Sequence, residues 1–174
     1  MYAHSSQQLT KNDPEEWLTN RAQGYVALKH SERQAIAYFC LLWSLFEAQK
    51  MTTQASARRI CETVKSWSLQ GALDIKLYEE PLAYFKKRYL SADGLTPNFY
   101  GLNFRPQDKR AAVEAVLRGT SRDVCDIVAA LLLITFRLRN NLFHGVKWGD
   151  ELRDQENNFS YANQVLIRTL EIDT

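Results

Sequence analysis

The sequence is poor in the residues that define several large classes of protein. Its three cysteines, Cys40, Cys61 and Cys125, are odd in number and lack the paired spacing of a zinc site or a disulfide framework. Histidine also occurs three times, and no cluster of His, Asp or Glu has metal-ligand spacing. There is no glycine-rich phosphate loop and no Ser, His and Asp order typical of a hydrolase. We therefore expect no metal and no cofactor.

An excess of charge of one sign is also missing. The 22 Lys and Arg against 20 Asp and Glu give a net charge of +2, so any nucleic-acid surface must be local. The segment MYAHSSQQLTKND lacks the basic and apolar regions of a secretory signal, and no segment reads as a membrane span. We expect a cytoplasmic protein with no membrane partner, in which a flexible tail, 1–12, precedes a single helical domain, 13–174.

Helical periodicity is present almost throughout, and no alternating strand of convincing length occurs. The predicted fold class is all-α. Residues 91–106 hold two glycines, two prolines and three aromatics without helical period, and they predict one long loop. Ser31 and Gln34 have the spacing of a capping box. The helices are expected at about 13–24, 35–50, 54–69, 73–89 with a kink or restart at Pro81, 107–118, 124–144 and 162–170.

The segment Ile127 to Gly145, IVAALLLITFRLRNNLFHG, organises the rest of the chain. Its first half is apolar on every side, which is typical of a helix at the centre of a domain. Its second half is polar, and Gly145 follows as a left-handed stop. The core helix therefore ends in a cluster of charge and amide, formed by Arg137, Arg139, Asn140, Asn141 and His144.

His144 is the histidine best placed for acid or base chemistry, because it lies where a buried helix ends beside basic residues. On an ideal helix Arg139 and His144 lie roughly 140° apart. Either the last turn distorts so that they converge, or they serve one site assembled with a second copy of the helix. A simpler interpretation pairs Arg139 with Glu47, a carboxylate on an inward helical face, and lets Asn140, Asn141 and His144 cap the helix.

The stretch RNNLFHG resembles the RNxxxH form of the arginine and histidine motif of HEPN domains, with Arg139, Asn140 and His144 at the defined positions. An earlier apolar helix with a late carboxylate, AYFCLLWSLFEAQ, and a later helix, SYANQVLIRTLEI, extend the resemblance over about 33–171. The resemblance implies a HEPN-like helical bundle and a metal-independent endoribonuclease, of the kind used as a toxin or in defence and stress responses. In other members of the family the domain is a noncatalytic RNA- or protein-binding dimerisation module.

The resemblance also implies roles and partners. His144 would move the proton and Arg139 would bind phosphate oxygens with its planar fork. Asn140 would orient His144 or the phosphate, and Glu47 would hold Arg139. The implied partners are RNA, a second copy in a homodimer and, as a further alternative, an antitoxin or nucleotidyltransferase. We place Arg137, Asn141 and Lys147 as substrate-binding candidates.

Overall fold

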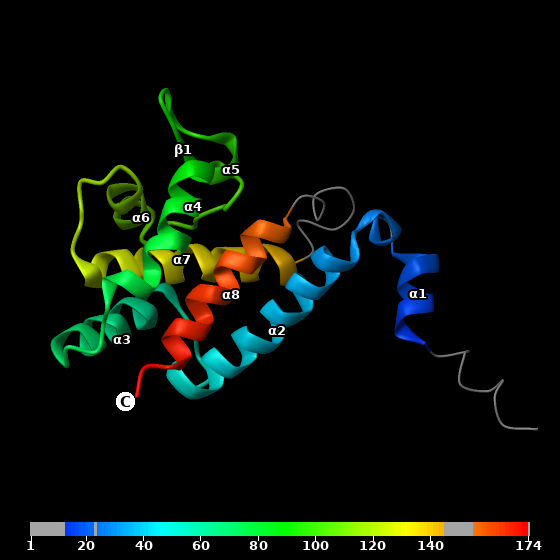
Figure 1. Cartoon of the computed structure of the whole chain (residues 1–174), viewed down its shortest axis with the longest axis horizontal. Coiled ribbons are helices and arrows are strands. Elements are labelled where there is room, and N and C mark those ends of the chain that lie inside the picture. The colour runs from blue at the N-terminus through cyan, green and yellow to red at the C-terminus, as the bar shows by residue number, and fades with distance from the viewer. Residues whose placement is uncertain (1–12, 23, 145–154, 174) are drawn as a thin grey trace, which may run out of the picture.

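The computed structural model describes residues 13–22, 24–144 and 155–173 and is predominantly helical, which confirms the all-α class (Figure 1). The predicted tail, 1–12, lies outside the described residues. None of the described helices combines the length and the apolar character that crossing a membrane requires.

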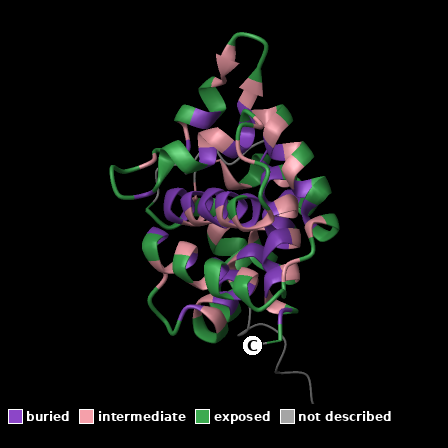
Figure 2. Ribbon diagram, turned by 90° about the vertical axis from the view of Figure 1, so that its left-hand side faces the viewer, coloured by how far each residue is buried: buried purple, intermediate pink, exposed green. Residues whose placement is uncertain are grey.

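Helix α7 (Val124–Phe143) is the central element, as expected. Asp123 caps its N-terminus by accepting a hydrogen bond from the Cys125 N–H at 2.8 Å. Most of its residues from Ile127 onward are buried, and they fall on every face of the helix. The ribbon diagram in Figure 2 marks buried residues in purple. A helix of this kind needs cover from several directions. The cover comes from α3 (Ala57–Leu69), α4 (Glu79–Tyr89), α6 (Arg110–Leu117) and α8 (Glu156–Leu170).

Helices α2 (His30–Lys50) and α8 lie side by side along most of their length (Figure 1). Asn163 Nδ2 donates to the Ala35 carbonyl at 3.1 Å, and the rings of Phe39 and Phe159 lie 5.0 Å apart. Because α8 also packs on α4 and α7, it sets the position of α2 relative to the central helix.

Several helix boundaries differ from the prediction because local hydrogen bonds select other caps. Helix α2 begins at His30, where the Glu32 carboxylate accepts the Lys29 N–H at 2.8 Å, so the capping interaction predicted for Ser31 and Gln34 is wrong. Helix α3 begins at Ala57, since Ser56 Oγ accepts the Arg59 N–H at 3.2 Å. The first helix, α1 (Pro14–Arg21), is followed by a 3₁₀ turn, η2 (Tyr25–Ala27).

The segment expected at 73–89 divides into a 3₁₀ turn, η3 (Ile75–Tyr78), and helix α4. Pro81 lies in the first turn of α4, where a missing N–H breaks no helical hydrogen bond, so the restart is the alternative observed.

The predicted long loop, 91–106, contains regular structure, so the prediction of one continuous loop is wrong. Strands β1 (Leu90–Ser91) and β2 (Gly94–Leu95) form a tight antiparallel hairpin, and α5 (Pro97–Tyr100) follows. Two-residue strands are too short to show an alternating pattern. Helix α6 begins only at Arg110, because Lys109 adopts a left-handed φ of 59°.

Candidate functional site

The C-terminal end of α7 stays helical through the motif. The His144 N–H donates to the Asn140 carbonyl at 3.0 Å, so the hydrogen-bond ladder continues to the helix end. The separation of roughly 140° between Arg139 and His144 is therefore retained. No hydrogen bond or ring contact joins these two side chains within the described part of the chain. The alternative in which the last turn distorts is not supported by this geometry.

Arg139 lies half-buried between α7 and α2. Its Nη2 is 3.8 Å from the Glu47 Oε2, and its Nη1 donates to the Asn140 Oδ1 at 3.1 Å. The guanidinium carbon lies 5.8 Å from the Trp43 ring centroid and 5.1 Å from that of Phe143. A guanidinium has five N–H donors, and only one of them forms a hydrogen bond here. The cation is held in place with its Nε buried, so the donors that remain for a ligand are on Nη1 and Nη2.

Glu47 holds more than Arg139. Its Oε2 accepts the Trp43 indole N–H at 3.0 Å, and its Oε1 accepts the Ala55 N–H at 3.2 Å. Its backbone carbonyl accepts the Thr53 N–H at 2.9 Å. Glu47 therefore fastens the turn after α2 and presents one side of its carboxylate to Arg139, which makes it a positioning residue.

His144 is exposed, and among the described residues its side chain has no hydrogen-bond partner. The simpler interpretation, in which the ring contacts the C-terminal carbonyls, is not observed, because only the backbone N–H of His144 makes such a bond. Asn140 is buried and its Oδ1 accepts from Arg139, so its amide positions the arginine. Lys147 lies outside the described residues.

Arg137 and Asn141 have structural contacts that the sequence did not reveal. Arg137 is 3% exposed, and its Nη1 donates to Asp108 Oδ2 at 2.9 Å while its Nε donates to the Leu102 carbonyl at 3.0 Å. Asn141 Nδ2 donates to the Gly101 carbonyl at 3.0 Å. Desolvation lowers the pKa of Arg137 although Asp108 opposes the shift, and the group stays charged at neutral pH. Both side chains clamp the connection before α6 and are too buried for the substrate-binding role predicted for them.

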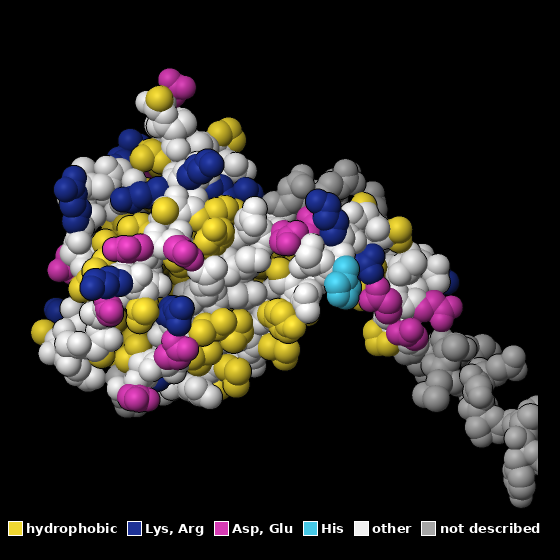
Figure 3. Space-filling model, viewed as in Figure 1, with side chains coloured by type: hydrophobic (Ala, Val, Ile, Leu, Met, Phe, Trp, Pro, Cys, Tyr) yellow, Lys and Arg dark blue, Asp and Glu magenta, His cyan; other side chains and the backbone are white. Residues whose placement is uncertain are grey.

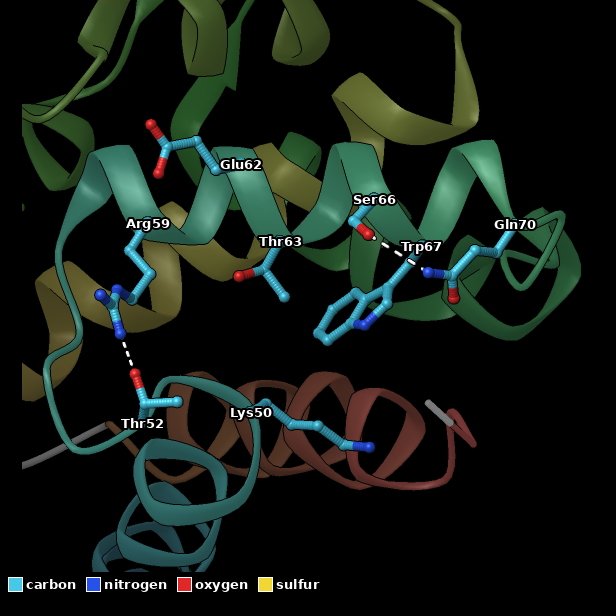
Figure 4. A pocket seen from close by; sticks show the side chains of 8 residues that line it. All are labelled: Lys50, Thr52, Arg59, Glu62, Thr63, Ser66, Trp67 and Gln70. Atoms are coloured by element: carbon cyan, nitrogen blue, oxygen red, sulfur yellow. Dashed lines mark hydrogen bonds between the residues drawn. The ribbon is translucent and has the colours of Figure 1, made fainter.

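A separate polar groove of about 410 Å³ lies between α3 and the C-terminal end of α2 (Figure 4). Arg59 points to its rim and donates to the carbonyl of Met51 and to the hydroxyl of Thr52. Thr52 and Thr53 both have positive φ, 46° and 61°, which is strained for β-branched residues. None of the motif residues lines this groove.

Ring contacts at the motif are the feature that sequence reasoning missed. Trp43 lies one turn before Glu47 and Phe143 directly before His144, so their spacing is the signal that could have placed both beside Arg139.

The described residues contain no group of three or more His, Cys, Asp or Glu side chains arranged to hold a metal ion. No family model, curated protein or solved structure matches this chain.

Proposed function

We propose that this protein is a metal-independent endoribonuclease with a HEPN-like fold, in which Arg139 and His144 carry the chemistry. The observation that supports this best is an exposed, unengaged imidazole at the end of a buried helix, five residues after a guanidinium that is held but keeps free donors. A structural cap residue would have its ring nitrogens engaged, and His144 does not within the described residues.

The chemistry requires a proton to leave the ribose 2′-hydroxyl and charge on the phosphate to be stabilised. His144 takes the proton from the 2′-oxygen, which then attacks the adjacent phosphorus and displaces the 5′-oxygen of the next nucleotide. Arg139 stabilises the charge that develops on the phosphate oxygens with a planar, bidentate fork. A proton returned to the leaving oxygen completes the step, and the product carries a 2′,3′-cyclic phosphate.

A second copy of the chain completes the site in this proposal. Because the two side chains diverge on a regular helix, one phosphate is best reached by Arg139 of one protomer and His144 of the other. An isologous dimer satisfies this requirement twice.

The outer face of α2 supports such a dimer. Tyr38, Leu41 and Leu45 are 52%, 64% and 48% exposed and recur at steps of three and four residues. Hydrophobic side chains gather over α2 and the neighbouring end of α8 in Figure 3. The exposed positions from 34 to 49 carry no Asp, Glu, Lys or Arg, and charge depletion is typical of interface cores. These positions are Gln34, Ala37, Tyr38, Leu41, Ser44, Leu45, Ala48 and Gln49.

The test is incubation of the purified protein with mixed cellular RNA in a chelator. Wild type is expected to cleave, and His144→Ala to lose about 10²- to 10⁴-fold in rate, the usual contribution of a general acid or base. Arg139→Lys is expected to fail as well, because a point charge does not replace the fork. Full activity in both variants would overturn the proposal.

Mixing the two inactive chains tests the shared site directly. A heterodimer of Arg139→Ala and His144→Ala retains one intact pair, His144 from the first chain and Arg139 from the second, so the mixture is expected to recover activity. If wild type dimerises but cleaves no RNA, the charge-free face of α2 favours the alternative function, a dimerisation module without turnover.

A further inference from the structure

One end of the molecule carries an excess of positive charge that the motif does not use. Residues 86–110 contain six basic and two acidic residues, a net charge of +4, whereas the remaining 16 basic and 18 acidic residues give −2. The chain brings these residues together at the C-terminal end of α4, the β hairpin, α5 and the N-terminal end of α6, where Lys and Arg side chains gather in Figure 3. We call this surface the basic end. It consists of Lys86, Lys87, Arg88, Tyr100, Arg105, Lys109 and Arg110.

The acidic residues of this segment do not neutralise the basic end. The carboxylate of Asp108 is buried and accepts hydrogen bonds from Arg137 and from the Arg105 N–H, so it does not face the surface of the basic end. Asp93 lies at the turn of the hairpin. Arg110 pairs with Glu114 at 2.6 Å, and within the described residues no other cation of the basic end lies in an ion pair. Of these cations, Lys87, Arg105 and Lys109 are exposed without a carboxylate partner among the described residues, whereas Lys86 and Arg88 are half-buried.

An aromatic platform lies among these cations. Tyr100 is 55% exposed, and the Arg110 guanidinium carbon lies 5.2 Å from its ring centroid. The Phe99 ring lies 6.1 Å away in an edge arrangement and is itself buried. The ring of Tyr100 is thus supported on one side and accessible on another. A fixed, exposed ring on a surface that also carries unpaired cations is the combination that binds single-stranded nucleic acid, because bases stack on the ring and phosphates contact the cations.

The basic end is fastened to the motif helix. Tyr100 immediately precedes Gly101, whose carbonyl accepts from Asn141, and Leu102, whose carbonyl accepts from Arg137. Asn141 lies three residues before His144 on α7. A single-stranded nucleic acid bound at Tyr100 would therefore lie close to the end of α7.

We propose that the basic end docks single-stranded RNA, with a base on Tyr100 and the phosphates on Lys87, Arg105 and Lys109. The identity of the strand as RNA rests on the proposed function. A duplex hides its base faces and offers Tyr100 nothing to stack on. An acidic membrane is the rival polyanion, and Asp93 at the projecting hairpin turn disfavours it because that carboxylate would face the lipid headgroups.

Binding is measured by fluorescence anisotropy with labelled oligouridylate of about 12 nucleotides, which lies within the site sizes typical of single-strand binders. The full chain carries His144→Ala so that the probe stays intact. Lys87→Glu combined with Lys109→Glu is expected to weaken binding and to reduce the slope of log affinity against log salt by about 1.4, since each lost phosphate contact removes about 0.7. Lys65→Glu combined with Lys76→Glu makes the same change of charge at exposed lysines outside the basic end and is expected to leave binding near that of the parent.

Tyr100 gives an independent readout. Tyr100→Ala is expected to weaken binding by about 5- to 150-fold, the range for one stacked base, and Tyr100→Phe to retain it. If the two double lysine variants lose the same binding affinity, the effect is one of net charge and the proposal is overturned. Variants of the basic end that bind oligouridylate as well as the parent would also overturn it. The same holds if these variants lose binding to phosphatidylserine vesicles but keep binding to oligouridylate. Specific binding without cleavage by wild type would remove the proposed function alone, and cleavage independent of the basic end would remove this inference alone.

Discussion

Replacing Glu47 with alanine is expected to destabilise the fold more than replacing Arg139, although the two residues form one ion pair. The carboxylate accepts hydrogen bonds from the Trp43 indole and the Ala55 N–H, at 3.0 and 3.2 Å. A hydrogen bond to a charged group contributes about 1.5–3 kcal/mol when buried. Glu47 is 25% exposed, so we expect about 2–3 kcal/mol for both bonds together.

Arg139→Ala removes weaker interactions. Its ion pair with Glu47 is long, 3.8 Å, with both side chains more than a fifth exposed, and such pairs contribute about 0–1 kcal/mol. The ring contacts with Trp43 and Phe143 add about 0.5–1 kcal/mol. The hydrogen bond to Asn140 Oδ1 adds about 0.5–1 kcal/mol. We expect a total loss of about 1–2 kcal/mol, which lowers the melting temperature by about 2–8 °C in a chain of this size.

Urea unfolding followed by circular dichroism measures both single variants and the double variant. The expected coupling energy between Glu47 and Arg139 is below about 1 kcal/mol. Glu47→Gln keeps an acceptor oxygen and is expected to lose less than Glu47→Ala. A coupling above about 2 kcal/mol, or a larger loss from Arg139→Ala, would refute the reasoning. It would also mean that arginine variants cannot separate catalysis from folding.

Asp108→Asn leaves the buried Arg137 guanidinium without a counter-charge and is expected to cost about 3–5 kcal/mol in the same urea assay, whereas a loss below about 1 kcal/mol would show the pair to be solvated. Within the part of the chain that the structure describes, the buried Tyr78 hydroxyl has no hydrogen-bond partner, and burial raises the pKa of Tyr78 to about 12. The folded state therefore loses stability as pH rises from 10 to 12, because the unfolded chain ionises first. At neutral pH, Tyr78→Phe is expected to have a melting temperature equal to or above that of the parent. Between pH 10 and 12 its melting temperature is expected to fall less than that of the parent, and an equal fall would contradict this. Leu41→Glu on the outer face of α2 is expected to give monomers of 20.1 kDa by sedimentation with little change in melting, and unchanged dimers would place the interface elsewhere.

The parts of the fold that periodicity encodes could be predicted from the sequence. The apolar run up to Leu138 and the polar end at His144 predict a central helix, and α7 spans Val124–Phe143. The proximity of Glu47 to Arg139 also followed from pattern, since each lies at the inward-facing end of an apolar stripe.

Contacts that depend on distant segments could not be predicted. In the sequence Arg137 and Arg139 look alike, and what separates them is the buried contact of Arg137 with Asp108, which lies 29 residues earlier in a different predicted helix, 107–118. The hairpin between α4 and α5 could not be predicted either, because its two-residue strands show no alternating pattern. They are fixed by the turn around Gly94, whose φ is 119°.

The pairing of α2 with α8 has a consequence for the order of events during synthesis. Lys50 donates to the Ile172 carbonyl, 122 residues later, and α8 carries most of the contact between α2 and the rest of the molecule. A chain growing on the ribosome therefore completes α7, with Arg139 and His144 in sequence, before the helix that locates Glu47 and Trp43 has emerged. Because α8 provides most of the contact that holds α2 in place, we expect the arginine to acquire its carboxylate and its indole only after α8 is made. The nascent chain thus carries the motif for some time without the packing that organises it, and the interval is set by the rate of translation.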